Sequence, residues 1–153
     1  MAYFLATGTL NPSRYRILAI GKLRKRWIQD GVELYCKRLP GLSITELREG
    51  SQIREGETIL TALKSNETLV ALSEDGETLH SEAFAERLSE FGSQRLAFLI
   101  GSAKGLSDEI KQTASWTLSL SSMTFPHDLA RLLLVEQIYR AQTILNGGPY
   151  HRS

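Results

Sequence analysis

The stretch from Arg95 to Gly105 reads RLAFLIGSAKG and decides the fold class. Its first six residues, Arg95–Ile100, form an almost uninterrupted apolar run, which is typical of a β-strand buried on both faces of a sheet. The small residues that follow turn the chain, and Ser107 is a favourable N-cap for a short helix. A doubly buried strand that leads into a helix indicates an α/β protein.

Elsewhere in the chain, strand-like runs also alternate with runs of helical periodicity. We expect strands at Arg16–Gly21, Leu42–Leu47, Glu67–Leu72, Arg95–Ile100 and Trp116–Leu120, with a turn at Glu74-Asp75-Gly76 after the third. We expect helices at Leu23–Tyr35, Ile53–Leu63, Leu79–Phe91, after Ser107, and at His127–Leu145, where Gly147-Gly148-Pro149 stops the last one. This alternation predicts a mostly parallel sheet of five to six strands with helices on both faces. Such sheets bind ligands at the carboxyl ends of their strands.

Length and composition limit the class of protein. The 153 residues fit one domain, which we expect over residues 14–153, after an N-terminal extension, residues 1–13, that we expect to be mobile. The chain is 42% hydrophobic and 23% charged, which excludes an intrinsically disordered protein. The single cysteine, Cys36, excludes a disulfide framework and a cysteine-based zinc site, and it favours the cytoplasm. No apolar run approaches the roughly 20 residues of a membrane helix, so we expect no membrane partner.

The net charge of +1 hides an uneven distribution of charge. Between residues 14 and 38 there are eight basic residues against two acidic ones, a net charge of +6. The basic residues are Arg14, Arg16, Lys22, Arg24, Lys25, Arg26, Lys37 and Arg38. This end of the chain either contacts a polyanion or forms a solvated helix face, and the composition alone leaves both interpretations open.

Three segments contain residue types that bind ligands or carry chemistry. The turn Gly101–Gly105 lets the backbone approach a ligand, although it matches neither the dinucleotide-binding pattern nor the P-loop. The loop Leu120–His127 offers main-chain groups to a small planar ligand, with Met123 and Phe125 as apolar walls. The tail Tyr150–Arg152 combines a ring that stacks on bases, an imidazole that moves protons and a guanidinium that binds phosphate. An ordinary turn, an ordinary loop and a frayed terminus remain open as interpretations.

Three further features bear on the site and on assembly. The three histidines, His80, His127 and His151, lack the spacing of metal ligands, so we expect no metal site. Glu136 interrupts the apolar run LLLVEQIY, which predicts a surface or interface carboxylate. The segment Leu129–Leu145 is apolar around most of its circumference, so it needs cover on more than one side, as a homodimer would provide.

Three segments, FLIGSAKGLS, WTLSLSSMTFPHDLARLLLVEQIYRA and PYHR, resemble the RlmH family in order and spacing from about Leu96 to Arg152. More loosely, RILAIGK and VALSEDG resemble the first and third strands of that family. Its members are small bacterial methyltransferases of the SPOUT class that act on N3 of a pseudouridine in 23S ribosomal RNA. The resemblance implies a C-terminal deep trefoil knot, S-adenosyl-L-methionine as cofactor, and a homodimer whose partner chain completes each active site. It also implies the large-subunit ribosomal RNA, in the ribosome, as partner.

The resemblance carries functional residues over to this chain. The cofactor contacts are implied at Leu72, Gly101, Ser102, Gly105, Leu120, Ser121, Ser122, Met123, Thr124 and Phe125. The tail residues Tyr150, His151 and Arg152 match the segment that approaches the target nucleotide: Tyr150 would stack on the base, His151 is a candidate base, with solvent as the alternative, and Arg152 would hold an oxyanion or a phosphate.

This chain departs from the family at the glycine turn, and other functions stay open. Gly-Ser-Ala-Lys-Gly stands where the family usually reads Gly-Gly-Pro-Glu-Gly, so Lys104 reverses a charge near the site. We expect the basic residues Lys22, Arg24, Lys25 and Arg26 beside the active cleft of the opposite subunit. The alternatives are a SPOUT methyltransferase for another RNA, such as tRNA, and a non-catalytic ribosome-binding module.

Overall fold

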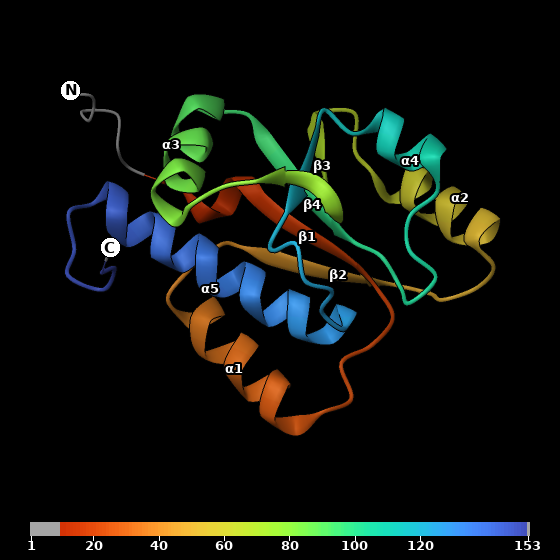
Figure 1. Ribbon diagram of the computed structural model, residues 1–153, viewed down its shortest axis with the longest axis horizontal. Helices are drawn as coiled ribbons and strands as arrows, with labels where there is room; N and C mark the ends of the chain where they lie inside the picture. Colours follow the sequence, from red (N-terminus) through yellow and green to blue (C-terminus); the bar gives the residue numbers. More distant parts are fainter. Residues whose placement is uncertain (1–9, 153) are drawn as a thin grey trace.

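The computed structural model describes residues 10–152 of the chain, which alternate strands and helices (Figure 1). The strands are β1 (Tyr15–Ile20), β2 (Ser43–Leu47), β3 (Glu67–Thr78), β4 (Arg95–Ile100) and β5 (Trp116–Ser119). The helices are α1 (Arg26–Lys37), α2 (Gln52–Ala62), α3 (Ser81–Phe91), α4 (Asp108–Thr113) and α5 (His127–Leu145), and a 3-10 helix, η1 (Pro12–Arg14), precedes β1. The five helices and four of the strands lie within a few residues of their predicted ranges, whereas β3 extends six residues past its predicted end at Leu72.

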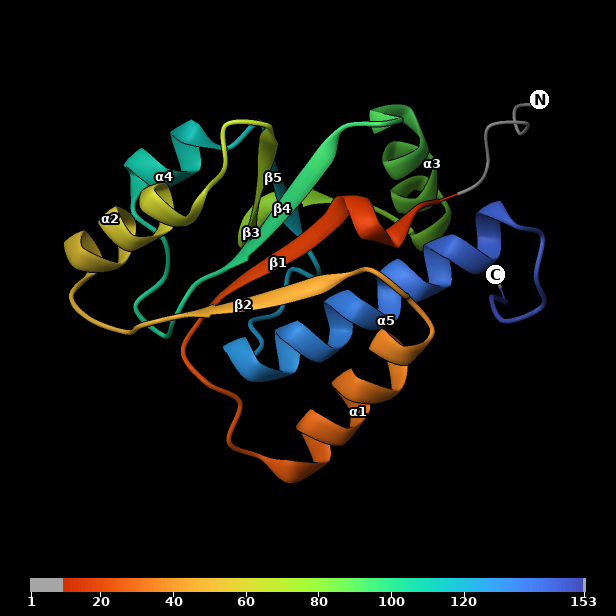
Figure 2. The same cartoon turned by 180° about the vertical axis from the view of Figure 1, so that it is seen from behind.

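All neighbouring strands of the sheet pair in parallel, in the order β2-β1-β4-β3-β5. The helices α1, α3 and α5 supply the core on one face, and α2 and α4 supply a second core on the other face (Figures 1 and 2). This arrangement confirms the predicted α/β fold with a parallel sheet between two helical layers. The trefoil knot that the resemblance implies stays a prediction.

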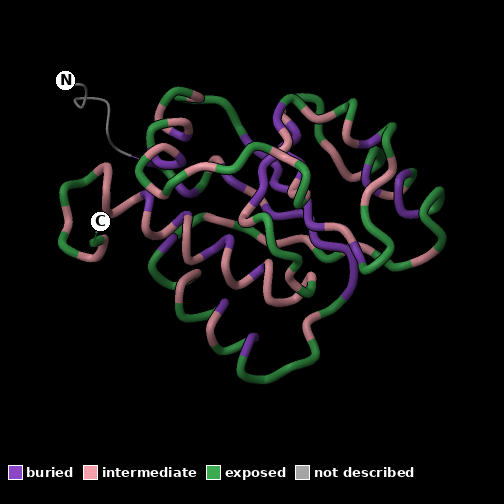
Figure 3. Tube along the Cα trace, viewed as in Figure 1, coloured by how far each residue is buried: buried purple, intermediate pink, exposed green. Residues whose placement is uncertain are grey.

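Strand β4 shows why the apolar run Arg95–Ile100 belongs at the centre of the sheet. Leu96, Phe98 and Ile100 point into the core beneath α1, α3 and α5, whereas Ala97 and Leu99 point into the core beneath α2 and α4. Side chains alternate between the two faces of a strand, so a strand covered on both sides must be apolar throughout. The buried backbone through the middle of the molecule is visible in Figure 3.

The first described residues pack on the domain. Leu10 and Pro12 are buried, and Leu10 belongs to the same core as α1, α3 and α5. The side chain of Asn11 caps η1 by accepting a hydrogen bond from the Ser13 amide at 3.1 Å. The last four residues of the predicted extension, 10–13, are therefore ordered against the fold, and residues 1–9 lie outside the described part of the chain.

The predicted turn at Glu74-Asp75-Gly76 is wrong, because this segment continues β3 along β5. Leu118 pairs with both Leu72 and Glu77, so the residues between them bulge from the ladder before pairing resumes. A Cβ on Gly76 would lie 2.7 Å from the carbonyl carbon and oxygen of Thr117. Only glycine, which has no Cβ, avoids this overlap. The bulge brings Ser73 and Glu74 to the carboxyl edge of the sheet.

Residues 10–152 contain no helix of the length and hydropathy needed to traverse a bilayer. Across that same range, no cluster of three or more His, Cys, Asp or Glu side chains is arranged to hold a metal ion.

Candidate functional site

A pocket of about 820 Å³ opens at the carboxyl ends of three adjacent strands, β4, β3 and β5. Its walls come from the end of β3 with the bulge, the turn after β4, the loop after β5 and the first turn of α5. All the residues named above as cofactor contacts line it, except Ser122. The position agrees with the general rule that open parallel sheets bind ligands outside their carboxyl edge.

The turn after β4 is compact because its glycines have close neighbours or unusual backbone angles. A Cβ on Gly101 would lie 2.8 Å from Leu106 Cδ2, and Gly105 has a φ of 75°. The Gly105 amide donates to the Ser102 carbonyl at 2.9 Å, which closes the turn. The Ser102 side chain is buried and accepts the Lys104 amide at 3.2 Å. The turn thus presents main-chain atoms and small side chains to the pocket.

The loop after β5 is tied to itself and to the bulge of β3. Ser119 Oγ donates to the Ser121 carbonyl at 2.8 Å, and the Met123 amide donates to Ser121 Oγ at 3.0 Å. Thr124 Oγ1 donates to the Glu74 carboxylate, which joins the two walls of the pocket. Met123 is 74% exposed, so this predicted apolar wall lies open to solvent in the single chain.

The charged residues of the pocket wall are Glu74, Lys104 and Lys111. Lys111 Nζ lies 3.2 Å from Asp75 Oδ2, on the bulge beside the pocket. The hydrogen bond from Ser73, together with the Lys111 ammonium, holds the pKa of Asp75 below its usual value. Each lysine at this wall has a carboxylate close by, Asp75 for Lys111 and Glu55 for Lys104.

The basic residues between β1 and α1 lie beside the start of α5. Lys25 Nζ is 3.6 Å from Asp128 Oδ2, one residue after His127 of the pocket wall. The Glu46 carboxylate fixes this segment by accepting the Leu23 amide at 3.2 Å and Arg131 Nη1 at 2.7 Å. Burial tends to raise the pKa of Glu46, but these bonds outweigh it and the pKa is lowered. The basic segment therefore adjoins the pocket of its own chain, and its part in a partner's site stays a prediction.

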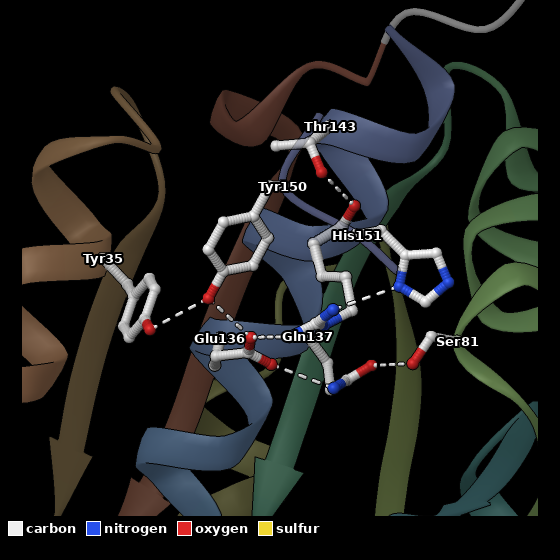
Figure 4. Close-up of polar contacts among 8 residues, drawn as sticks. Tyr35, Ser81, Glu136, Gln137, Thr143, Tyr150 and His151 are labelled. Carbon is white, nitrogen blue, oxygen red and sulfur yellow. Dashed lines mark hydrogen bonds and ion pairs between the residues drawn. The ribbon is translucent and has the colours of Figure 1, made fainter. Parts of the chain in front are cut away.

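The C-terminal tail is held by side chains of α1 and α5 (Figure 4). The Tyr150 hydroxyl donates to Glu136 Oε2 at 2.8 Å and lies 3.1 Å from the Tyr35 hydroxyl. The Arg140 guanidinium lies over the Tyr150 ring, 4.8 Å from its centroid, and binds Glu136 at 2.7 Å. Burial, with the hydrogen bonds to Tyr35 and Glu136, raises the pKa of Tyr150. The tail is therefore anchored, and Tyr150 keeps its proton at neutral pH.

Both ring nitrogens of His151 have charged neighbours. Nδ1 lies 3.0 Å from Arg140 Nη1, and Nε2 lies 3.1 Å from Glu82 Oε2 of α3. A guanidinium can only donate, so Nδ1 accepts and the proton of a neutral ring sits on Nε2, facing Glu82. Arg152, the next residue, is exposed.

Glu136 binds the tail, a contact that the sequence did not predict. The sequence predicts a surface or interface carboxylate there, but its side chain is only 16% exposed and binds Tyr150, Arg140 and Gln137. The available signal in the sequence was the charge of Glu136 within the apolar run LLLVEQIY. The partners of that charge are not visible in the sequence.

The pocket and the tail contact different parts of α5. His127 and Ala130 in its first turn line the pocket, whereas the tail turns back after the helix ends and contacts Glu136 and Arg140. The described tail residues are absent from the pocket wall. Within one chain, the candidate cofactor contacts come together, but the candidate catalytic residues do not join them.

Comparisons with known proteins agree on one family. The family model described as "Predicted SPOUT methyltransferase" matches residues 13–151. A relative named Ribosomal RNA large subunit methyltransferase H, from Prochlorococcus marinus (strain MIT 9303), is 67% identical over 90% of this chain and 92% of its own length. A relative of the same name from Synechococcus sp. (strain CC9605) is 60% identical over 94% of this chain and all of its own.

One solved structure illustrates the likeness in fold. A probable methylase family protein from Haemophilus influenzae superposes with a TM-score of 0.58 at 14% identity, over 93% of this chain and 72% of that protein.

Proposed function

The chain belongs to the SPOUT methyltransferase family, and from this premise we propose that it transfers a methyl group from S-adenosyl-L-methionine to RNA of the large ribosomal subunit. The observation that carries the proposal is the pocket at the carboxyl edge, where the turn after β4 and the loop after β5 meet. We further propose N3 of a pseudouridine as the acceptor and the cytoplasm as the place of action, both from the resemblance of the C-terminal segments.

The residues of the pocket fit this cofactor. Its volume of about 820 Å³ lies in the range of cofactor sites, which is about 300–1,000 Å³. A Cβ at Gly101 would collide with Leu106, so the turn after β4 needs glycine there to pack this closely at the edge of the pocket. Leu72 and Leu106 are apolar walls for a purine ring, and Lys104 and Lys111 suit a carboxylate. When bound, the cofactor supplies an electrophilic methyl group on its sulfonium sulfur.

The residues of the chain must align the acceptor and favour loss of its N3 proton. We assign Tyr150 to stacking on the acceptor base and Arg152 to stabilising the negative charge that develops as the proton leaves. The His151 Nδ1 lone pair is engaged by Arg140, so we assign His151 to positioning and the proton to solvent. Replacing His151 with alanine tests this choice. His151 would be the base if the variant lost most of the single-turnover rate and also lost a titration that the pH profile of the wild type shows.

A homodimer follows from the separation of pocket and tail. Because Tyr150–Arg152 pack on α5 and do not line the pocket of their own chain, a complete site needs the tail of a second copy beside the pocket. Residues around most of α5 are only partly buried in the single chain, among them Leu129, Leu132 and Leu133, which leaves apolar surface for that copy. Sedimentation as a dimer at low micromolar concentration is expected, and a monomer there would contradict the arrangement.

RNA binding is assigned to the basic segment that precedes and opens α1. Lys22, Arg24, Lys25 and Arg26 are exposed, and the adjoining Trp27 ring is 60% exposed and available to stack on a base. This surface adjoins the pocket through the contact between Lys25 and Asp128.

The decisive assay methylates large ribosomal subunits from cells that lack the modification. Transfer of a labelled methyl group is expected, and mass spectrometry of the nucleosides should find it on pseudouridine. Replacing that pseudouridine with uridine should abolish most of the product. Methylation of tRNA instead would support the alternative RNA target, and failure to bind S-adenosyl-L-methionine at millimolar concentration would support a binding module.

A further inference from the structure

Glu55 is a buried carboxylate beside the donor pocket but outside its wall. It lies in the first turn of α2, and only 4% of its side chain is exposed. Burying a carboxylate is costly unless hydrogen bonds compensate, so its partners indicate what it holds. Those partners lie in two loops, one before α2 and one after β4.

Both oxygens of Glu55 accept hydrogen bonds. Oε2 accepts the Gly50 amide at 3.0 Å, and Oε1 accepts the Ser102 hydroxyl at 2.9 Å. Ser102 Oγ in turn accepts the Lys104 amide at 3.2 Å, so one hydroxyl links the carboxylate to the backbone of the turn. Helix α2 is therefore linked through Glu55 to the turn Gly101–Gly105.

Lys104 adds an ionic contact to the same group. Its Nζ lies 3.8 Å from Glu55 Oε2, and the lysine also lines the pocket. The carboxylate thus attracts the ammonium and limits the positions that it can take at the pocket wall. Gln52, three residues before Glu55 on α2, also holds the loop after β4, because its side-chain amide donates to the Lys104 carbonyl at 3.4 Å.

We propose that Glu55 is a positioning residue for the methyl donor: through Ser102 and Lys104 it holds the turn Gly101–Gly105 in the shape that binds S-adenosyl-L-methionine. This inference rests on the proposed function, because it takes the pocket as the donor site. Glu55 acts only through the turn, so it sets donor affinity and leaves the transfer step and RNA binding unchanged.

Calorimetry with S-adenosyl-L-methionine tests the proposal on the full-length protein. Glu55→Gln keeps the shape of the side chain but replaces one accepting oxygen with a donor, so one of its two bonds is lost. We expect a roughly tenfold higher Kd for the donor. The turnover at saturating donor and the Kd for RNA should stay within a factor of two. Glu57→Gln, an exposed acid on the same helix, is the matched control and should bind like the wild type.

The same titration separates positioning from folding. A purely structural role would lower the number of binding sites and the melting temperature but leave the donor Kd of the folded fraction unchanged, and that result would overturn the inference. Should Glu55→Gln not fold, Glu55→Asp carries the test, since it keeps the charge but draws the carboxylate away from Gly50 and Ser102. A raised donor Kd in its folded fraction supports the inference, and wild-type affinity overturns it.

The wild type distinguishes this inference from the proposed function. Wild-type protein that does not bind S-adenosyl-L-methionine would overturn the proposed function and this inference with it. Wild-type protein that binds the donor, with Glu55→Gln binding it equally well, would overturn only the role of Glu55.

Discussion

Replacing Gly76 with alanine tests the close contact between the β3 bulge and the backbone of β5. One wall of the pocket depends on this contact. The new Cβ would lie 2.7 Å from the carbonyl carbon and oxygen of Thr117 and 2.9 Å from the carbonyl carbon of Leu118. All three are backbone atoms inside a paired strand, so no side-chain rotation relieves the overlap. Overpacking of this kind costs about 1–3 kcal/mol. For a chain of this size, that free energy lowers the melting temperature by roughly 2–12 °C.

The matched substitution is Gly56→Ala, in the interior of α2. Its Cβ would lie 3.7 Å from Ile110 Cγ1, which is an ordinary contact, and alanine favours a helix over glycine by about 0.5–1 kcal/mol. Urea denaturation should therefore show Gly76→Ala less stable and Gly56→Ala slightly more stable than the wild type. Because Ser73 and Glu74 line the pocket, Gly76→Ala should also bind the donor more weakly. Wild-type stability and donor affinity in Gly76→Ala would refute the close contact between Gly76 and the backbone of β5.

Three further outcomes are expected. Tyr150→Phe removes the bond to Glu136, so single-turnover methylation should fall by roughly tenfold while donor affinity is retained; loss of donor affinity instead would argue against separate sites. Replacing Lys25 and Arg26 with glutamate should weaken ribosome binding and flatten its dependence on salt, and an unaltered salt slope would leave these residues as a solvated face. Burial tends to raise the pKa of Glu67, but the hydrogen bonds from Arg16 outweigh burial, and the pKa is lowered. This pair therefore stabilises the fold fully at pH values above the pKa of a glutamate in the unfolded chain. The stabilisation is lost as the pH falls through the lower pKa of the folded state. Urea titrations should show less acid destabilisation in Glu67→Gln, and an unchanged pH profile would contradict that linkage.

Local signals in the sequence account for the sheet and for the pocket. The apolar run Arg95–Ile100 requires cover on both faces, and the structure provides it with two helical layers. The carboxyl ends of parallel strands share one edge of the sheet, so the sequence predicts the turn Gly101–Gly105 and the loop after β5 at the same edge, although β3 separates β4 from β5. The structure brings both to the same pocket, together with Leu72.

The contacts that the sequence did not reveal join residues far apart in the chain. The bulge of β3 depends on pairing with β5, some forty residues later, and turn-forming residues at Glu74-Asp75-Gly76 concealed it. The anchor of the tail joins Tyr35 to Tyr150, which are 115 residues apart. Neither leaves a periodic pattern, because each depends on how whole elements pack rather than on local spacing.

Mixed dimers test most directly the central claim that one chain supplies the donor pocket and its partner supplies the tail. One chain carries Gly101→Leu, whose added side chain takes the space beside Leu106, and the other carries His151→Ala with Arg152→Ala. Each homodimer should be inactive in single-turnover methylation. The mixed dimer should regain activity at one of its two sites, since an intact pocket then faces an intact tail. A mixed dimer as inactive as both parents, although it binds S-adenosyl-L-methionine, would contradict the account.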